Sequence, residues 1–480
     1  MYRDRGQTTS HNPPADRRTS ALLRVTTATA AVLAALALLG AACSGGGEAP
    51  PNGSAEASTP ASQSTPSPAA AGSAEPDATE PGSAATPGEP PPPLPPSIAR
   101  ALAEIAEVRD LDPPPDLRAN VIRRSELPDL LDSLITDEER ETYHNTTTLY
   151  RLLGHFTDDQ DYLSLYTAFG ATGILGLYSP LDDELWIVSD AGTEGLENLS
   201  RSESETLAHE LVHALQDYNF SLDETLRQLD DSLDRSLAYI ALVEGDAVIH
   251  EGLYSDNYLL LRPAGRLGLV GIAQTGPAAI PTSFIRELIF PYTDGADFAR
   301  SIRGQGGTAA LDEYLANPPS STSVILHPEI EARGFVPEVM ELPRLEDALG
   351  ASWEWESGGT VGEFHLGNYL QLGLSGASAR EAATGWAGDR YDVYVGGTDS
   401  LAILRLRFGT EREAEEFADA HLRMLDGRAL DSGMEGETRV FELDGGKWTA
   451  VPPRNGPDIL FVAATSKDLA LQALALIAGS

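Results

Sequence analysis

The spacing of hydrophobic positions changes several times along this chain, and each spacing predicts a different element. Leu207, Leu211 and Leu215 recur at every fourth residue, which predicts an amphipathic helix. Similar helical patterns cover 98–108, most of 127–165, 232–255, 411–425 and 467–477. Alternating patterns predict strands over 391–395, 401–408, 439–443, 448–451 and 459–464. Extended segments at 121–124 and 184–189 come before the leucine helix, and a turn at 180–183 indicates a hairpin.

The order of these elements predicts an α+β fold in two parts. A mainly helical part is expected over 98–343, and the alternation of strands and helices after it predicts a smaller α+β module over 344–480. Within that module, 353–383 reads as helical stretches and Gly385-Trp-Ala-Gly-Asp-Arg390 as a loop. No group of residues in it indicates a chemistry, and substrate docking and structural closure are equally compatible with it.

The first 43 residues read as a targeting segment. Arg17, Arg18 and Arg24 precede an apolar stretch over 25–42, which ends at Cys43. The segment resembles a bacterial lipoprotein signal, although Gly40 stands three before the cysteine, where that pattern usually has leucine. Cys43 is the only cysteine, so a lipid anchor at Cys43 is expected. Ordinary secretory cleavage and an uncleaved anchor are the alternatives.

Composition adds a tether and excludes one class of partner. Residues 44–97 are rich in Pro, Ala, Ser and Gly and hold no Lys or Arg, so they predict a disordered tether that holds the folded part off a membrane. The chain of 480 residues has 73 acidic against 33 basic residues, a net charge of −40. A phosphate backbone would be repelled, so no nucleic-acid partner is expected.

The strongest chemical signal is the pentapeptide His209-Glu210-Leu-Val-His213. On a helix, its two histidines project from one face about one turn apart, where one tetrahedral zinc can take both and keep places for a third ligand and a water. Glu210 can then act as general base on that water. The preceding Ser202-Glu-Ser-Glu205 predicts a capping box. Without a metal, burying these groups would be costly.

A third ligand is expected from the helix over 232–255. Glu244 lies on the apolar face of that helix, and a carboxylate there needs a charged partner, which zinc supplies. Asp246, His250 and Glu251 are alternatives whose positions fit that face less well.

This combination resembles the gluzincin branch of zinc metallopeptidases, the thermolysin-like clan. The resemblance implies a zincin-like domain over 98–343 that binds one Zn²⁺ per chain through His209, His213 and Glu244. It also implies that Asp217, four residues after His213, supports that ligand. Thermolysin-like enzymes place an aspartate four after the third ligand, where this chain has valine. Asp246 is therefore expected to serve instead, unless the support is built differently.

The chain also resembles little-characterised bacterial secreted or lipoprotein peptidase-like proteins. These combine an Ala-His-Glu-Leu-x-His-Ala-Leu-Gln-Asp motif with an Ala-Leu-x-Glu-Gly-Asp-Ala motif, both of which this sequence contains. That likeness runs over most of the chain from about residue 100 and brings no known substrate. Metzincins are not a model, because the residues after His213 lack their glycine and third histidine.

Two further residues are candidates for stabilising the oxyanion of peptide hydrolysis, a task that usually needs a donor besides the metal. His327, in a polar loop before Pro328, is the first candidate, and Tyr292 is the second. A histidine that only holds its own turn and a packed tyrosine are the alternatives. The strand at 184–189 is expected to offer an edge to a substrate backbone, although an ordinary structural hairpin fits equally well.

Together these observations predict a membrane-tethered, extracytoplasmic zinc metallopeptidase that hydrolyses peptide bonds in a peptide or protein. A secreted form is the alternative location. One rival function is a lipoprotein binding module that retains the fold and the zinc without turnover, and another is a zinc hydrolase of non-peptide amides. The sequence leaves open the cleavage specificity, the oligomeric state and a propeptide, for which residues 98–140 are the candidate.

Overall fold

The computed structural model describes residues 93–170, 176–189, 192, 199, 201–229, 232–255 and 280–479. The expected signal segment, Cys43 and the tether up to residue 92 lie outside these residues. In the described part, no helix has the length and apolar character needed to cross a membrane.

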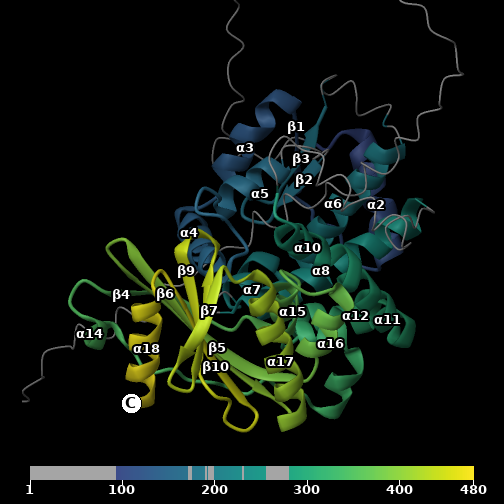
Figure 1. The fold of residues 1–480 in the computed structure, drawn as a ribbon. Helices are drawn as coiled ribbons and strands as arrows, with labels where there is room; N and C mark the ends of the chain where they lie inside the picture. The colour runs from purple at the N-terminus through teal and green to yellow at the C-terminus, as the bar shows by residue number, and fades with distance from the viewer. Residues whose placement is uncertain are drawn as a thin grey trace, which may run out of the picture.

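The first part of the described chain is mainly helical, as the hydrophobic spacing predicted (Figure 1). Its elements are α2 (Pro96–Arg109), β1 (Arg118–Ile122), α3 (Leu127–Leu134), α4 (Asp137–Leu153), α5 (Tyr162–Gly170), β2 (Gly176–Ser179), β3 (Glu184–Val188), α6 (Arg201–Phe220), α7 (Leu222–Arg227), α8 (Leu233–Ser255), α10 (Thr282–Phe290), the π-helix η5 (Pro291–Gly295), α11 (Ala296–Gly306), α12 (Thr308–Ala316) and α13 (Thr322–Leu326). Short 3₁₀ turns, η3 (Arg124–Glu126) and η6 (Pro328–Arg333), and the helix α14 (Glu346–Leu349) complete it.

The second part alternates strands and helices, which confirms the α+β class of the molecule. Its elements are β4 (Glu354–Gly359), α15 (Gly362–Leu370), α16 (Gly376–Ala383), β5 (Trp386–Gly396), β6 (Asp399–Phe408), α17 (Glu411–Arg428), β7 (Asp431–Glu435), β8 (Thr438–Leu443), η7 (Asp444–Gly446), β9 (Lys447–Val451), β10 (Asp458–Ala464) and α18 (Lys467–Gly479).

A small sheet stands beside α6. Its order is β1-β3-β2, with β1 parallel and β2 antiparallel to β3. The predicted hairpin is therefore present as β2 and β3. The strand that was expected to offer an edge, β3, instead pairs on both sides, and β1 and β2 are the edge strands of this sheet. Side chains of the sheet, including Leu185 and Ile187, share a core with α2 and with Leu211 and Leu215 of α6. That packing fixes β2 against the helix of the His-Glu-x-x-His motif.

The large antiparallel sheet has the order β4-β5-β6-β10-β9-β8-β7. Alternate residues of β6 face opposite sides, as the strand period requires. Leu404 and Leu406 pack in the core that contains α17, while Leu401 and Ile403 pack in the core that contains α18. The α17 side of the sheet also meets α4, α5 and α10, so one core crosses the expected boundary at 343/344.

Three local expectations differ from the structure. The segment Gly385–Arg390 is not a loop, because β5 begins at Trp386 with an irregularity before Gly388. Gly388 is needed there because a Cβ would lie 2.3 Å from the carbonyl oxygen of Glu338. Strands β4 and β7 were not predicted. The helix α6 begins at Arg201, so Ser202 falls inside its first turn and not at the predicted cap.

Candidate metal centre

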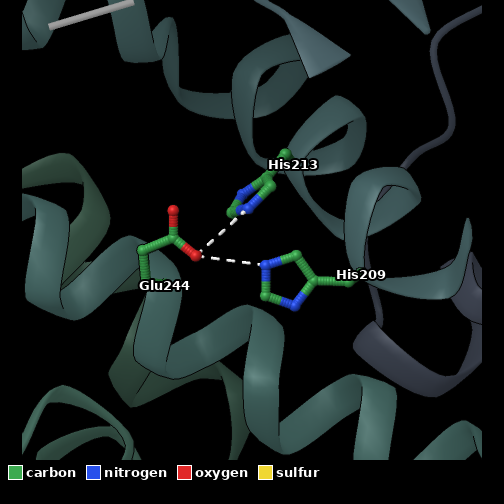
Figure 2. A group of neighbouring side chains, drawn as sticks. All are labelled: His209, His213 and Glu244. Carbon is green, nitrogen blue, oxygen red and sulfur yellow. Dashed lines mark hydrogen bonds and ion pairs between the residues drawn. The ribbon is translucent and has the colours of Figure 1, made fainter. Parts of the chain in front are cut away.

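The helices α6 and α8 bring two histidines and a glutamate together in the interior. His209 and His213 come from α6, and Glu244 comes from the middle of α8. Figure 2 shows both imidazole rings turned toward the Glu244 carboxylate. All three side chains are buried, and one ligand atom from each lies within 4.8 Å of the others. These are the three residues that the sequence proposed as metal ligands.

The two distances from Glu244 to the histidines are close to those between ligand atoms around a tetrahedral zinc. The Oε2 atom of Glu244 lies 3.1 Å from Nε2 of His209 and 3.5 Å from Nε2 of His213. Zinc bonds of about 2.0 to 2.2 Å at tetrahedral angles separate neighbouring ligand atoms by about 3.4 Å. The Nε2 atom of His213 and Oε1 of Glu244 are buried without a hydrogen-bond partner. An unpartnered His213 Nε2 atom with a carboxylate oxygen 3.5 Å away fits a cation.

The outer nitrogen of each histidine is held by a neighbouring side chain. Nδ1 of His209 lies 3.2 Å from Oε2 of Glu251, and Nδ1 of His213 lies 2.9 Å from Oε1 of Gln216. Both partners present an oxygen, so each Nδ1 is placed to donate a proton. Nε2 of each histidine faces Glu244 and is the nitrogen that would bind a metal. Without a metal, Nε2 of His209 also faces a carboxylate oxygen and is protonated as well.

The electrostatics of the group also favour a cation. Burial alone would raise the pKa of Glu244, but His213 and His209 outweigh it and lower the pKa to about 2. Burial alone would lower the pKa of His209, yet its contacts with Glu244 and Glu251 raise that pKa well above its usual value. Without a metal, a proton on His209 compensates part of the negative charge of these carboxylates. A divalent cation bound among them would take over that role.

Glu210 lies between α6 and the edge strand β2. Its Oε2 atom accepts a hydrogen bond of 2.8 Å from the backbone N–H of Tyr178, and its Oε1 atom is buried without a partner. A cavity of about 10 Å³ has Glu210, Gly176 and Leu185 in its wall, which is room for about one water. Burial raises the pKa of Glu210 to about 7. The carboxylate is thus fixed at one oxygen and available at the other.

Tyr292 is the oxyanion candidate that the fold brings to this group. Its ring stacks on His209 with centroids 6.1 Å apart, and its hydroxyl is buried next to Glu244. Burial raises the pKa of Tyr292 well above 10, and the charges of Glu244 and Glu210 raise it further. The hydroxyl therefore stays protonated beside both carboxylates and can donate.

Two glycines allow η5 to approach α8 closely enough to place Tyr292. A Cβ on Gly245 would lie 2.3 Å from the carbonyl oxygen of Gly295, and a Cβ on Gly295 would lie 2.1 Å from that of Ala241. Backbone therefore packs directly on backbone at this crossing, in the turn of α8 that contains Glu244 and three residues after Tyr292. Any larger side chain would force η5 away from the metal group.

Replacing Gly295 with alanine is therefore expected to lower the free energy of unfolding by roughly 1 to 3 kcal/mol, the usual cost of overpacking. The measurement is chemical denaturation of the metal-free chain. Gly304→Ala is the matched control, because Gly304 lies in α11 with no atom within 4 Å of its Cβ position. Equal denaturation midpoints for the two variants would show that the close approach is dispensable.

His327, the first oxyanion candidate from the sequence, lies elsewhere. Its Nε2 atom is 2.7 Å from Oε1 of Glu363 in α15, and among the described contacts none joins it to the histidines of α6 or to Glu244. It lines a cavity of about 600 Å³ together with Glu363, Thr293 and Arg286. Glu363 raises the pKa of His327. His327 is the C-cap residue of α13 and pairs with Glu363. These two local contacts account for a histidine at this position in the loop.

The structure revises the expected support of the ligands. Asp217 makes no hydrogen bond to His213; it accepts hydrogen bonds of 2.8 Å from the Tyr178 hydroxyl and from the backbone N–H of Leu222. Gln216, one residue earlier, takes the predicted place because position i+3 of a helix faces position i as well as i+4 does. Asp246 does lie behind His213, connected through Gln216 at 2.8 Å.

Sequence reasoning missed two supporting residues, Gln216 and Arg109, and named a third, Glu251, only as an alternative ligand. Gln216 could have been found from its i+3 spacing to His213, and Glu251 from its place two turns after Glu244. Arg109, whose guanidinium reaches Asp246 across 137 positions of sequence, gave no local signal.

Comparison with known proteins bears on the C-terminal region. Residues 354–473 match the model of a domain of unknown function (DUF8575), which begins with β4 and ends within α18. The match covers the large sheet and none of the residues of the metal centre. No curated protein and no solved structure matches the chain.

Proposed function

We propose that this protein is a zinc-dependent peptide hydrolase of the gluzincin type, with one Zn²⁺ held by His209, His213 and Glu244. The observation that carries the proposal is the spacing of these three buried side chains, with Nε2 of both histidines facing Glu244, beside a second glutamate with a free oxygen. Zinc bound there would supply a Lewis acid that lowers the pKa of a coordinated water and polarises a carbonyl group.

Glu210 is the general base of this proposal. The N–H of Tyr178 holds its Oε2 atom, so Oε1 is left to take a proton from the attacking water and to return it to the leaving amine. A site that only bound metal would need no such carboxylate, which favours hydrolysis over the rival function of a binding module without turnover.

The proposal of a peptide as substrate rests on the His-Glu-x-x-His chemistry and the resemblance, and not on the edge of β2. All four residues of β2 are buried, and the strand pairs with β3 on one side. On the other side it lies along α6, where Glu210 accepts the hydrogen bond of the Tyr178 N–H. The proposed setting is outside the cytoplasm, with a lipid at Cys43 as the membrane anchor or with secretion as the alternative.

Tyr292→Phe is expected to lower kcat by about 10²- to 10³-fold, because the variant keeps the packed ring and removes a donor to the oxyanion. Zinc affinity should stay at the parent value. The measurement is steady-state cleavage of a peptide by the zinc-loaded chain, beside His327→Gln. A larger loss in His327→Gln than in Tyr292→Phe would reverse the assignment.

The experiment that tests the proposed function combines zinc content with turnover. The purified full-length chain should bind one zinc, cleave an unfolded protein, lose that activity to a chelator and regain it with zinc. Stoichiometric zinc without cleavage of any unfolded protein would contradict the proposal. Turnover of a small amide with no turnover of peptides would favour the hydrolase of non-peptide amides.

A further inference from the structure

Gln216 is locked in one orientation by its own partners. Its amide Nε2 donates to the carbonyl oxygen of Val243 at 3.0 Å and to Oδ2 of Asp246 at 2.8 Å. Both partners are acceptors, so the amide nitrogen must face them and Oε1 must face His213. The orientation of Gln216, and with it the proton on Nδ1 of His213, is therefore set by Asp246 and Val243 of α8.

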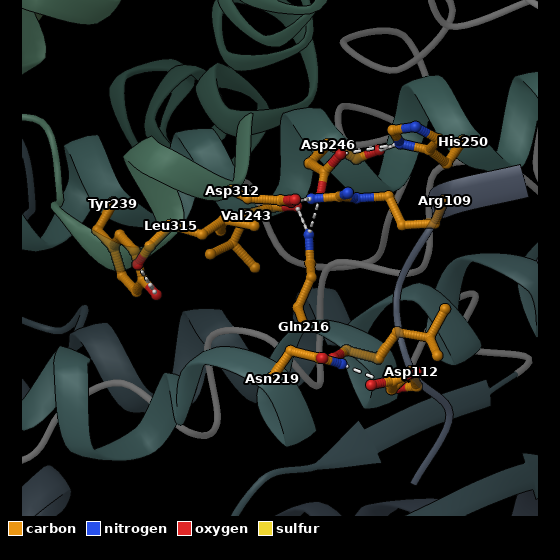
Figure 3. Close-up of polar contacts among 11 residues, drawn as sticks. Arg109, Asp112, Gln216, Asn219, Tyr239, Val243, Asp246, His250, Asp312 and Leu315 are labelled. Carbon is orange, nitrogen blue, oxygen red and sulfur yellow. Dashed lines mark hydrogen bonds and ion pairs between the residues drawn. The ribbon is translucent and has the colours of Figure 1, made fainter. Parts of the chain in front are cut away.

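Asp246 is in turn held by a buried arginine from the N-terminal helix. Nε of Arg109 lies 2.9 Å from Oδ2 of Asp246, the same oxygen that accepts from Gln216. Nδ1 of His250 lies 2.8 Å from Oδ1. Arg109 and Asp246 are both fully buried, and a second guanidinium nitrogen of Arg109 reaches Asp312 of α12 at 2.6 Å. Figure 3 shows this row of contacts running from α2 to Gln216.

We infer that Arg109 is a positioning residue of the metal centre, which acts through Asp246 and Gln216 to hold His213 as an Nε2 ligand. The helix α2 is then a part of the site and not a removable cover, although residues 98–140 were the candidate propeptide. The inference rests on the proposed metal centre. It assigns to α2 a role in metal affinity, although α2 lies far from the metal ligands in the sequence.

The test measures the zinc affinity of the full-length chain by competition with a chromophoric chelator. Gln216→Met and Arg109→Met are each expected to weaken zinc binding by about 10- to 100-fold, the usual effect of losing a partner behind a ligand. Asn219→Leu is the matched control. Asn219 also lies on α6, and its amide ties the carbonyl oxygen of Asp112, just after α2, to that helix at 2.9 Å.

A double-mutant cycle separates positioning from general destabilisation. If Arg109 acts through Gln216, Arg109→Met should change zinc affinity little in a chain that already carries Gln216→Met. Arg109→Lys keeps the positive charge, so in an otherwise unchanged chain it should bind zinc more tightly than Arg109→Met does. Gln216→Met leaves the Arg109–Asp246 ion pair in place, so it stays informative where Arg109→Met fails to fold.

Three outcomes would overturn the inference, and they are distinguishable. Unchanged zinc affinity in Gln216→Met, or fully additive losses in the double variant, would remove the role of Arg109 and leave the metal centre standing. A parent chain that binds no zinc would end both proposals. Thermal unfolding of each metal-free variant reports the structural part of the effect separately.

Discussion

Glu210→Gln is expected to lower kcat by about 10²- to 10⁴-fold, the range that a positioned general base contributes. Glutamine has the shape of glutamate, and its amide oxygen can still accept the hydrogen bond from the Tyr178 N–H. Its amide nitrogen then takes the place of Oε1 and cannot accept a proton from water. The change therefore removes the base and keeps the fold and the three ligands.

The measurement is cleavage of an unfolded protein by the zinc-saturated chain, with the zinc content of each preparation determined in parallel. Glu203→Gln is the matched control, because Glu203 lies two turns earlier on α6 and lines the same small cavity. Its kcat should stay close to the parent value. Full turnover in Glu210→Gln with zinc bound would show that another group takes the proton.

The local part of the metal centre was predictable because its geometry is set by helix periodicity alone. His209, Glu210 and His213 lie on one continuous helix, so their relative placement needs no knowledge of the rest of the fold. The same holds for the hairpin of β2 and β3 and for most strands of the large sheet, whose alternating patterns record one buried face.

Glu244 was chosen as the third ligand from its position on one face of the helix, and the structure shows that this reason is incomplete. The sequence places it on an apolar face, whereas α8 is buried on all sides from Leu237 to Gly252. Asp246, His250 and Glu251 are therefore buried too, and periodicity could not rank them. What separates them is the partner each one meets, and those partners come from α2 and α6.

The remaining differences concern contacts between segments far apart in the sequence. The ranking of Tyr292 and His327 as oxyanion candidates depends on whether η5 can touch α8. The close approach of Gly245 and Gly295 makes that contact possible. Neither glycine indicates by itself that its partner is the other. Arg109 illustrates the same limit, because a lone arginine at the end of an amphipathic helix normally lies in solvent.

Loss of a side chain behind a metal ligand usually lowers metal affinity by about 10- to 100-fold. Glu244→Gln removes a ligand itself, so it is expected to lower zinc affinity by more than that. The charged oxygen that lies 3.1 Å from His209 Nε2 and 3.5 Å from His213 Nε2 would become part of a neutral amide, a poor zinc ligand. Zinc should raise the melting temperature of the parent chain, since a ligand that binds the folded state stabilises it. That shift should disappear in Glu244→Gln.

Glu251→Gln provides the comparison that decides the assignment. Glu251 is also buried on α8 and also contacts His209, but through Nδ1 and so from behind the ligand. An isosteric amide there keeps an oxygen for the Nδ1 proton, so the expected loss of zinc affinity is at most about 10- to 100-fold. Because the two variants change the same chemical group on the same helix, a larger loss in Glu251→Gln would mean that Glu251 binds the metal and Glu244 supports it.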